Sequence, residues 1–145
     1  MAVDEIHVRT PPERVFAVLS DRRKYGEWVV GTDTTHPSEG DWPEPGSTLC
    51  YTTAGPVKLS NRTVVLKADA PRRLELRAKS GPLPDVDITI DVLPENGGTL
   101  VRMHERPTSG VVNVLTGPLG HFALSRRNQV ALDRLRRIAE TGTAS

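Results

Sequence analysis

The sequence predicts an α+β protein in which an antiparallel sheet of about six strands wraps around a long C-terminal helix, with two short helices after the first strand. Three observations carry this prediction. The middle of the chain is a series of strand-like runs with short turns between them, which favours an antiparallel meander over βαβ units. The later runs alternate apolar and polar residues, so one sheet face must be covered. A continuous helical pattern near the C-terminus can supply that cover.

Composition fits one globular domain over residues 1–145. The chain is long enough to bury a core without disulfides or metals, and its 37% hydrophobic and 26% charged residues argue against disorder. The net charge of +1 leaves no basic surface typical of a nucleic-acid-binding protein. No apolar run is long enough to span a bilayer, so stable membrane insertion is not expected.

The cysteine and histidine residues argue against a disulfide-bonded or metal-binding protein. The lone Cys50 excludes an internal disulfide and favours a reducing cytoplasm, and the N-terminus lacks the pattern of a signal peptide. The four histidines are scattered, without metal-ligand spacing. We therefore expect a cytoplasmic protein with no metal and no cofactor. The oligomeric state stays open, with a homodimer as one option.

The chain begins with a strand over residues 2–9 and then a helix start. Thr10 can act as the N-cap, Pro11 and Pro12 suit the first helical positions, and Glu13 follows three residues after the cap. This spacing predicts a capping box.

A second short helix is predicted next. Asp21 can cap its start, the helix continues through Trp28, and Gly31 is placed to end it. Residues 31–46 are polar and rich in proline and glycine, which predicts a loop.

The sheet is predicted from the runs that follow. Gly-Pro and Ala-Pro steps separate most of them, and Glu95-Asn96-Gly97-Gly98 is a strong hairpin signal. The predicted strands are 47–54, 57–68, 72–79, 85–93 and 99–106.

The terminal helix is predicted from Pro118 to Thr141, with Gly142 as its C-cap. Residues 110–117 are ambiguous and fit either a linker or an earlier helical turn. One face of the helix repeats at spacings of three and four. That face carries Leu124, Asn128, Ala131, Leu135 and Ile138.

This order of elements is the helix-grip arrangement, and the stretch from Thr10 to Asp21, followed by Tyr25 and Trp28, resembles the opening of the START-like (SRPBCC) superfamily. Gly98-Thr-Leu-Val101 leading into Glu105 and the long terminal helix strengthen the likeness. The chain is similar to members grouped as polyketide cyclase/dehydrase and lipid transport proteins. The resemblance implies an internal pocket for a hydrophobic ligand more than it implies a reaction.

Glu105 is the candidate catalytic residue. It shares strand parity with Val101 and Met103, which places it on the predicted inner face. A carboxyl group facing an apolar cavity has a raised pKa and could move protons. The alternative is a carboxylate at an open strand end, solvated or paired with an arginine.

The candidate ligand-binding residues are polar or aromatic side chains expected beside the same cavity. An amide or guanidinium on the terminal helix could orient a carbonyl or phenolate of the ligand, or stabilise an enolate, although both groups could instead serve structure. Aromatic side chains could stack on a ligand or simply fill the core. The set comprises Trp28, Tyr51, Met103, Leu124, Arg127 and Asn128.

Three functions remain open from the sequence. The first is binding of an apolar or aromatic small molecule, polyketide- or lipid-like, between the sheet and the terminal helix. The second is a cyclase, aromatase or dehydratase that uses Glu105 as acid or base. The third is a protein-interaction module of the same fold, suggested by the apolar residues within 110–117.

Overall fold

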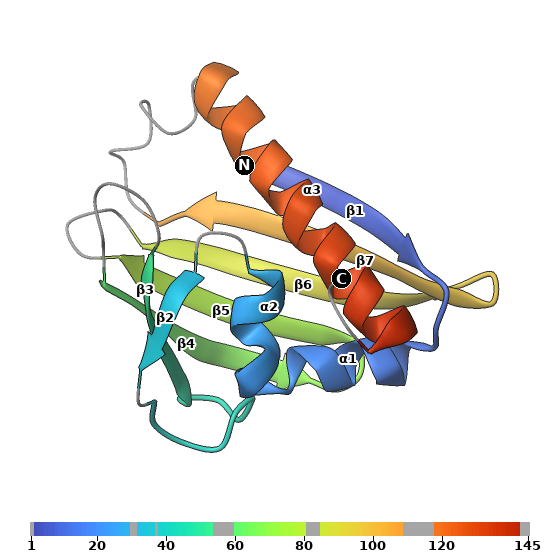
Figure 1. The fold of residues 1–145 in the computed structure, drawn as a ribbon, viewed down its shortest axis with the longest axis horizontal. Helices are drawn as coiled ribbons and strands as arrows, with labels where there is room; N and C mark the ends of the chain where they lie inside the picture. The colour runs from blue at the N-terminus through green and yellow to red at the C-terminus, as the bar shows by residue number, and fades with distance from the viewer. Residues whose placement is uncertain are drawn as a thin grey trace.

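The computed structural model describes residues 2–29, 32–36, 38–53, 60–80, 85–108 and 118–142. Within these residues, seven antiparallel strands form one sheet in the order β1-β7-β6-β5-β4-β3-β2. Figure 1 shows the sheet with the long helix α3 lying across one face and the short helices α1 and α2 on the same side. The elements are β1 (Ala2–Val8), α1 (Pro12–Leu19), a 3₁₀ turn (Arg22–Lys24), α2 (Tyr25–Trp28), β2 (Thr32–His36), β3 (Thr48–Thr53), β4 (Ser60–Asp69), β5 (Arg73–Ser80), β6 (Val86–Glu95), β7 (Gly98–Pro107) and α3 (Pro118–Thr141).

The predicted fold class is confirmed, with one strand more than the six expected. The additional strand, β2, lies inside the segment 31–46 that was predicted as a loop. Its sequence TDTTH carries no apolar alternation, and β2 is an edge strand that pairs with β3. A strand made of polar residues gives no periodic hydrophobic signal, so its pattern resembles that of a loop.

The start of α1 differs from the predicted capping box. Pro11 is the N-cap, without a side-chain cap hydrogen bond, and its backbone is extended (φ −62°, ψ 153°). This extended proline separates Thr10 from the first helical turn. Thr10 is instead buried, and its carbonyl oxygen accepts a 2.7 Å hydrogen bond from the Thr99 hydroxyl. The prediction that Thr10 caps the helix is therefore wrong, although Pro12 does occupy the first turn.

Asp21 caps the next turn as predicted. Its carboxylate accepts a 3.0 Å hydrogen bond from the backbone N–H of Arg23, at the start of the 3₁₀ turn that leads into α2. Helix α2 then ends at Trp28. Gly31, which was expected to end it, lies outside the described residues.

The hairpin between β6 and β7 is confirmed. Asn96 and Gly97 both have positive φ, at 34° and 79°, which is the backbone that a two-residue hairpin turn requires. The strands it joins pair from Val86↔Pro107 to Glu95↔Gly98. This register sets which side chains of β7 face α3.

The core fills the space between the inner face of the sheet and the helices. Leu74, Ile90, Val92 and Val101 from the sheet are at most 1% exposed. Helix α3 adds Leu132, Leu135, Ile138 and Ala139, all almost fully buried. At about 25 cal/mol per Å² of apolar surface, this burial is the main source of stability.

The end of α3 also follows the prediction. Gly142 has φ +89°, and its N–H donates a 2.7 Å hydrogen bond to the carbonyl oxygen of Ile138. Residues 110–117, predicted as either linker or helical turn, lie outside the described residues. In the part of the chain that the structure describes, no helix is long and apolar enough to cross a bilayer.

Candidate functional site

A group of polar side chains is buried between α3 and the inner face of the sheet, in surroundings that are otherwise apolar. Alternation along each strand turns the sheet members of the group inward, and the helical repeat turns the amide of α3 toward them. Polar groups in such a place are normally hydrogen-bonded, because burying them without partners costs free energy. The buried members are Asp4, Asn61, Thr63, Glu105 and Asn128.

Glu105 faces inward, as its strand parity predicts. It is 4% exposed and stands opposite Ile88 on β6. Burial raises the pKa of this carboxyl above its usual range, while the charge of Arg127 and a hydrogen bond from Asn128 partly offset the rise. The group is thus a carboxyl whose protonated form is favoured by its surroundings.

Arg127 approaches Glu105 from the solvent side of α3. Its Nη2 lies 3.5 Å from Oε1 of Glu105, at the long limit of a hydrogen bond, and its side chain is 51% exposed. The guanidinium therefore stays largely hydrated beside the buried carboxyl. Such a half-exposed, loosely paired arginine contributes little to stability.

Asn128 connects two carboxylates. It is 2% exposed, its Nδ2 donates a 3.2 Å hydrogen bond to Oδ2 of Asp4, and its side chain also hydrogen-bonds with Glu105. Gln129 adds a 3.3 Å hydrogen bond to the other oxygen of Asp4. The structure thus places the predicted Glu105, Arg127 and Asn128 together.

A second part of the polar group contains both tyrosines of the chain. The rings of Tyr25 and Tyr51 lie 5.6 Å apart, and their hydroxyls hydrogen-bond with each other and with Thr63. Burial raises the pKa of both phenols. Trp28 packs edge-on against Tyr25, with ring centroids 5.3 Å apart. The phenols are close enough to Arg127 for its charge to act on the pKa of each.

The apolar surroundings of this group differ along the sheet. Toward α1, the inner-face side chains are fully packed, as described above. Toward the other end, Ala78, Val86 and Ile88 face inward but are only half-buried. Glu105 lies directly across from Ile88, so the buried carboxyl stands where the closed core gives way to partly exposed apolar surface.

The remaining predicted residues lie in or beside this region. Met103 is buried on the inner face of β7, two residues from Glu105 and across from Asp4. Trp28 and Tyr51 are both buried, as core packing and cavity lining each require. Leu124 belongs to α3, but its side chain lies outside the described residues. A metal is not suggested: among the described side chains, no group of three or more metal-binding residues occurs.

Sequence reasoning missed Asp4, Tyr25 and Thr63. Asp4 shares parity with Ile6 and Val8, so its inward position was readable from the alternation of β1. The link between Tyr25 and Thr63 was not readable, because α2 and β4 meet only through the tertiary fold.

Comparison with known proteins identifies the relatives of the chain. Residues 2–140 match the family described as "Polyketide cyclase / dehydrase and lipid transport". A search of curated protein sequences finds no significant match.

Solved structures with the same fold include three of known source or context. A protein from Arthrobacter aurescens aligns with a TM-score of 0.76 and 17% identity, covering 99% of this chain and 88% of that one. The Aha1 dimer from Colwellia psychrerythraea gives 0.70 and 16%, covering 97% and 96%. DynU16, from the dynemicin biosynthetic locus, gives 0.73 and 15%, covering 99% of this chain and 48% of that chain.

At these identities the structural likeness shows a shared fold and no more. The family match is stronger evidence of relationship, because it extends over nearly the whole chain, from the first strand almost to the end of α3. The chain belongs to the polyketide cyclase/dehydrase and lipid transport family.

Proposed function

We propose that the chain binds an apolar or aromatic small molecule, polyketide- or lipid-like, in a cavity between the inner face of the sheet and α3. The observation that carries this proposal is the buried polar group set among apolar side chains. Family membership supports a hydrophobic ligand as its occupant. The dynemicin-locus protein of the same fold comes from a biosynthetic setting that agrees with this class.

The polar group is more than the core needs for stability. Two carboxyl groups, Asp4 and Glu105, are each about 95% buried, and burying such groups is costly even when they are hydrogen-bonded. A core of the same shape made from apolar residues would avoid this cost. Polar groups that converge in an apolar site are typical of ligand pockets, where they fix the orientation of the bound molecule.

The half-buried apolar side chains supply the complementary surface. Ala78, Val86 and Ile88 form a short patch on the inner face, next to Glu105. Ring or alkyl groups of the ligand would lie on this patch. Its carbonyl or hydroxyl groups would then meet Glu105, Asn128 and the tyrosine hydroxyls.

A thermal-shift screen with aromatic ketones, phenols and fatty acids tests this proposal. A ligand that binds only the folded state stabilises it by RT ln(1 + [L]/Kd), so Tm keeps rising with the logarithm of ligand concentration above Kd. We expect at least one of these classes to raise Tm in this concentration-dependent way. Absence of any shift across all three classes would count against a binding role.

The second candidate is an enzyme of the cyclase, aromatase or dehydratase type that uses Glu105 as acid or base. The raised pKa of Glu105 favours it, since a buried acid with a raised pKa can act in proton transfer near neutral pH. To test whether Glu105 takes part in a reaction, turnover of a poly-β-keto or aldol-type substrate is measured for the parent protein and for Glu105→Gln. Equal turnover by both removes Glu105 from any mechanism.

The third candidate, a protein-interaction module, was suggested by residues 110–117, which lie outside the described residues. The cytoplasmic location and the homodimer also stay predictions.

A further inference from the structure

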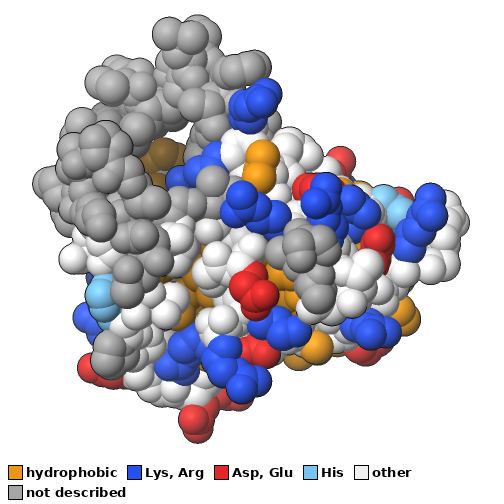
Figure 2. Space-filling view, in the orientation of Figure 1, with side chains coloured by type: hydrophobic (Ala, Val, Ile, Leu, Met, Phe, Trp, Pro, Cys, Tyr) orange, Lys and Arg blue, Asp and Glu red, His pale blue; other side chains and the backbone are white. Residues whose placement is uncertain are grey.

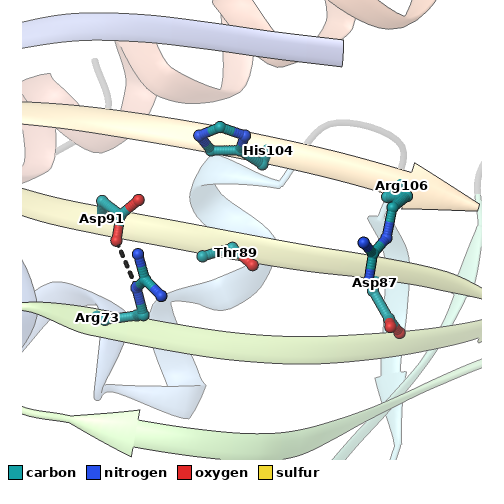
Figure 3. A pocket seen from close by; sticks show the side chains of 6 residues that line it. All are labelled: Arg73, Asp87, Thr89, Asp91, His104 and Arg106. Atoms are coloured by element: carbon teal, nitrogen blue, oxygen red, sulfur yellow. Dashed lines mark hydrogen bonds and ion pairs between the residues drawn. The ribbon is translucent and has the colours of Figure 1, made fainter. Parts of the chain in front are cut away.

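The outer face of the sheet, away from α3, carries a solvent-open depression of about 230 Å³ on strands β5, β6 and β7 (Figure 3). Successive side chains on a strand point to opposite faces, so His104 faces outward where Glu105 faces inward. The depression is therefore separated from the buried polar group by the sheet itself. It is lined by Arg73, Asp87, Thr89, Asp91, His104 and Arg106.

A short side chain among long ones creates this depression. Thr89 stands directly opposite His104 in the β6–β7 register, and Arg106 follows two residues along β7. Figure 3 shows Thr89 between Arg73 and Arg106, with the His104 ring beside it on β7. The threonine hydroxyl thus forms the floor, and longer basic side chains form the walls.

The two aspartates of the depression are already neutralised. Arg73 Nε lies 2.6 Å from Oδ1 of Asp91. Arg77 holds Asp87 at two points, with Nε–Oδ1 at 2.8 Å and Nη2–Oδ2 at 3.1 Å. Two-point pairing of this kind fixes the carboxylate and uses both of its oxygens. The aspartates therefore serve to position the arginines rather than to attract a cation.

The other polar groups of the lining offer hydrogen-bond donors. Within the described parts of the chain, no hydrogen bond or ion pair engages the side chain of Arg106 or of His104. Arg73 pairs with Asp91 through Nε, which leaves its two terminal nitrogens for a further acceptor. Glu75 stands across from Thr89 on β5, but Lys67 stands across from Glu75 in turn and offsets its charge.

We propose that this depression binds a small oxyanion, the carboxylate or phosphoryl group of a metabolite, held by Arg106, His104 and the Thr89 hydroxyl. A guanidinium binds either group through charge-assisted hydrogen bonds, and an imidazole N–H and a hydroxyl complete a three-sided donor set. The volume suits such a group better than a polyketide-like molecule. The site is independent of the proposed interior ligand.

Titration of ¹⁵N-labelled protein with inorganic phosphate, and separately with acetate, tests this inference by NMR. Ionic strength is held constant with NaCl, because exposed charges are screened by salt. We expect saturable shifts of the Thr89 and His104 signals with Kd on the order of millimolar. Saturation with phosphate alone assigns the site to phosphoryl groups, and saturation with both anions assigns it to oxyanions in general.

Three variants and a control make the test specific. Arg106→Gln and His104→Gln each remove a donor, and we expect about tenfold weaker binding for the arginine variant. Thr89→Met fills the depression without changing its charge and should abolish binding. Arg62→Gln removes an exposed arginine of β4 that does not line the depression, and it should leave binding unchanged. No saturable shift, or equal weakening by Arg62→Gln, would overturn the proposal.

Discussion

Asn128 and Asp4 are 124 positions apart in the sequence, and a 3.2 Å hydrogen bond joins their side chains. The contact ties α3 to the first strand. Asn128 also hydrogen-bonds with Glu105, so one amide serves two buried carboxyl groups. Figure 2 views the molecule from the side on which α3 lies, and basic side chains gather there on the solvent side of the helix. The Asn128 amide, by contrast, faces inward.

We expect replacement of Asn128 to lower the free energy of unfolding more than replacement of the neighbouring Gln129. Asn128→Ala removes a buried donor from two buried carboxyl groups, and a hydrogen bond to a charged group contributes about 1.5–3 kcal/mol. Gln129→Ala is the matched control, since it removes an exposed amide donor to Asp4. We expect a smaller loss for the control in urea unfolding. Equal effects of the two variants would contradict a special role for Asn128.

The raised pKa of Glu105 predicts a pH-dependent cost to the folded state. The pKa of Glu105 is higher in the folded protein than in the unfolded one, so the folded protein binds more protons at pH values between the two. The free energy of unfolding therefore falls as pH rises through the folded-state pKa. Glu105→Gln removes this dependence. We expect the stability of the variant, relative to the parent, to increase as pH rises above the ordinary range of a glutamate carboxyl.

Chemical denaturation at several pH values measures that difference. Subtracting the parent from the variant cancels the contributions of Asp21 and Asp133, whose lowered pKa values act in the opposite sense. A stability difference that stays constant with pH would show that Glu105 has an ordinary pKa in the folded state.

The two tyrosines predict an unusual alkaline titration. The chain has no others, and burial raises the pKa of both. Ultraviolet absorbance should therefore show less phenolate than free tyrosine gives at about pH 10. Phenolate should increase as circular dichroism reports unfolding. Ionisation of either phenol at its ordinary pKa in a folded protein would contradict the buried Tyr25–Tyr51 pair.

Much of the fold could be predicted because its signals are local. Alternation placed Glu105 on the inner face, Asn96-Gly97 predicted the hairpin, and Gly142 predicted the end of α3. Strand β2 was missed because a polar edge strand has no apolar period. The capping box failed because the extended Pro11 is the N-cap in place of Thr10, whose carbonyl oxygen accepts a hydrogen bond from Thr99.

The candidate site was predictable to the extent that it follows strand and helix parity. Glu105, Arg127 and Asn128 were placed together from the periodicities of β7 and α3. The partnership of Tyr25 with Thr63 depends on how α2 packs over β4, which no periodicity encodes. Such contacts between distant elements need the tertiary structure.

The most direct test of the proposed ligand role is to fill the inner-face patch and measure binding. Ile88→Trp places a large ring beside Glu105, while Leu66→Trp adds the same ring at an exposed position of β4. Isothermal titration uses the strongest ligand from the thermal-shift screen. We expect Ile88→Trp to weaken binding at least about tenfold, roughly 1.4 kcal/mol, and Leu66→Trp to leave Kd unchanged. Unchanged affinity in Ile88→Trp, with the fold intact, would contradict a binding site between the sheet and α3.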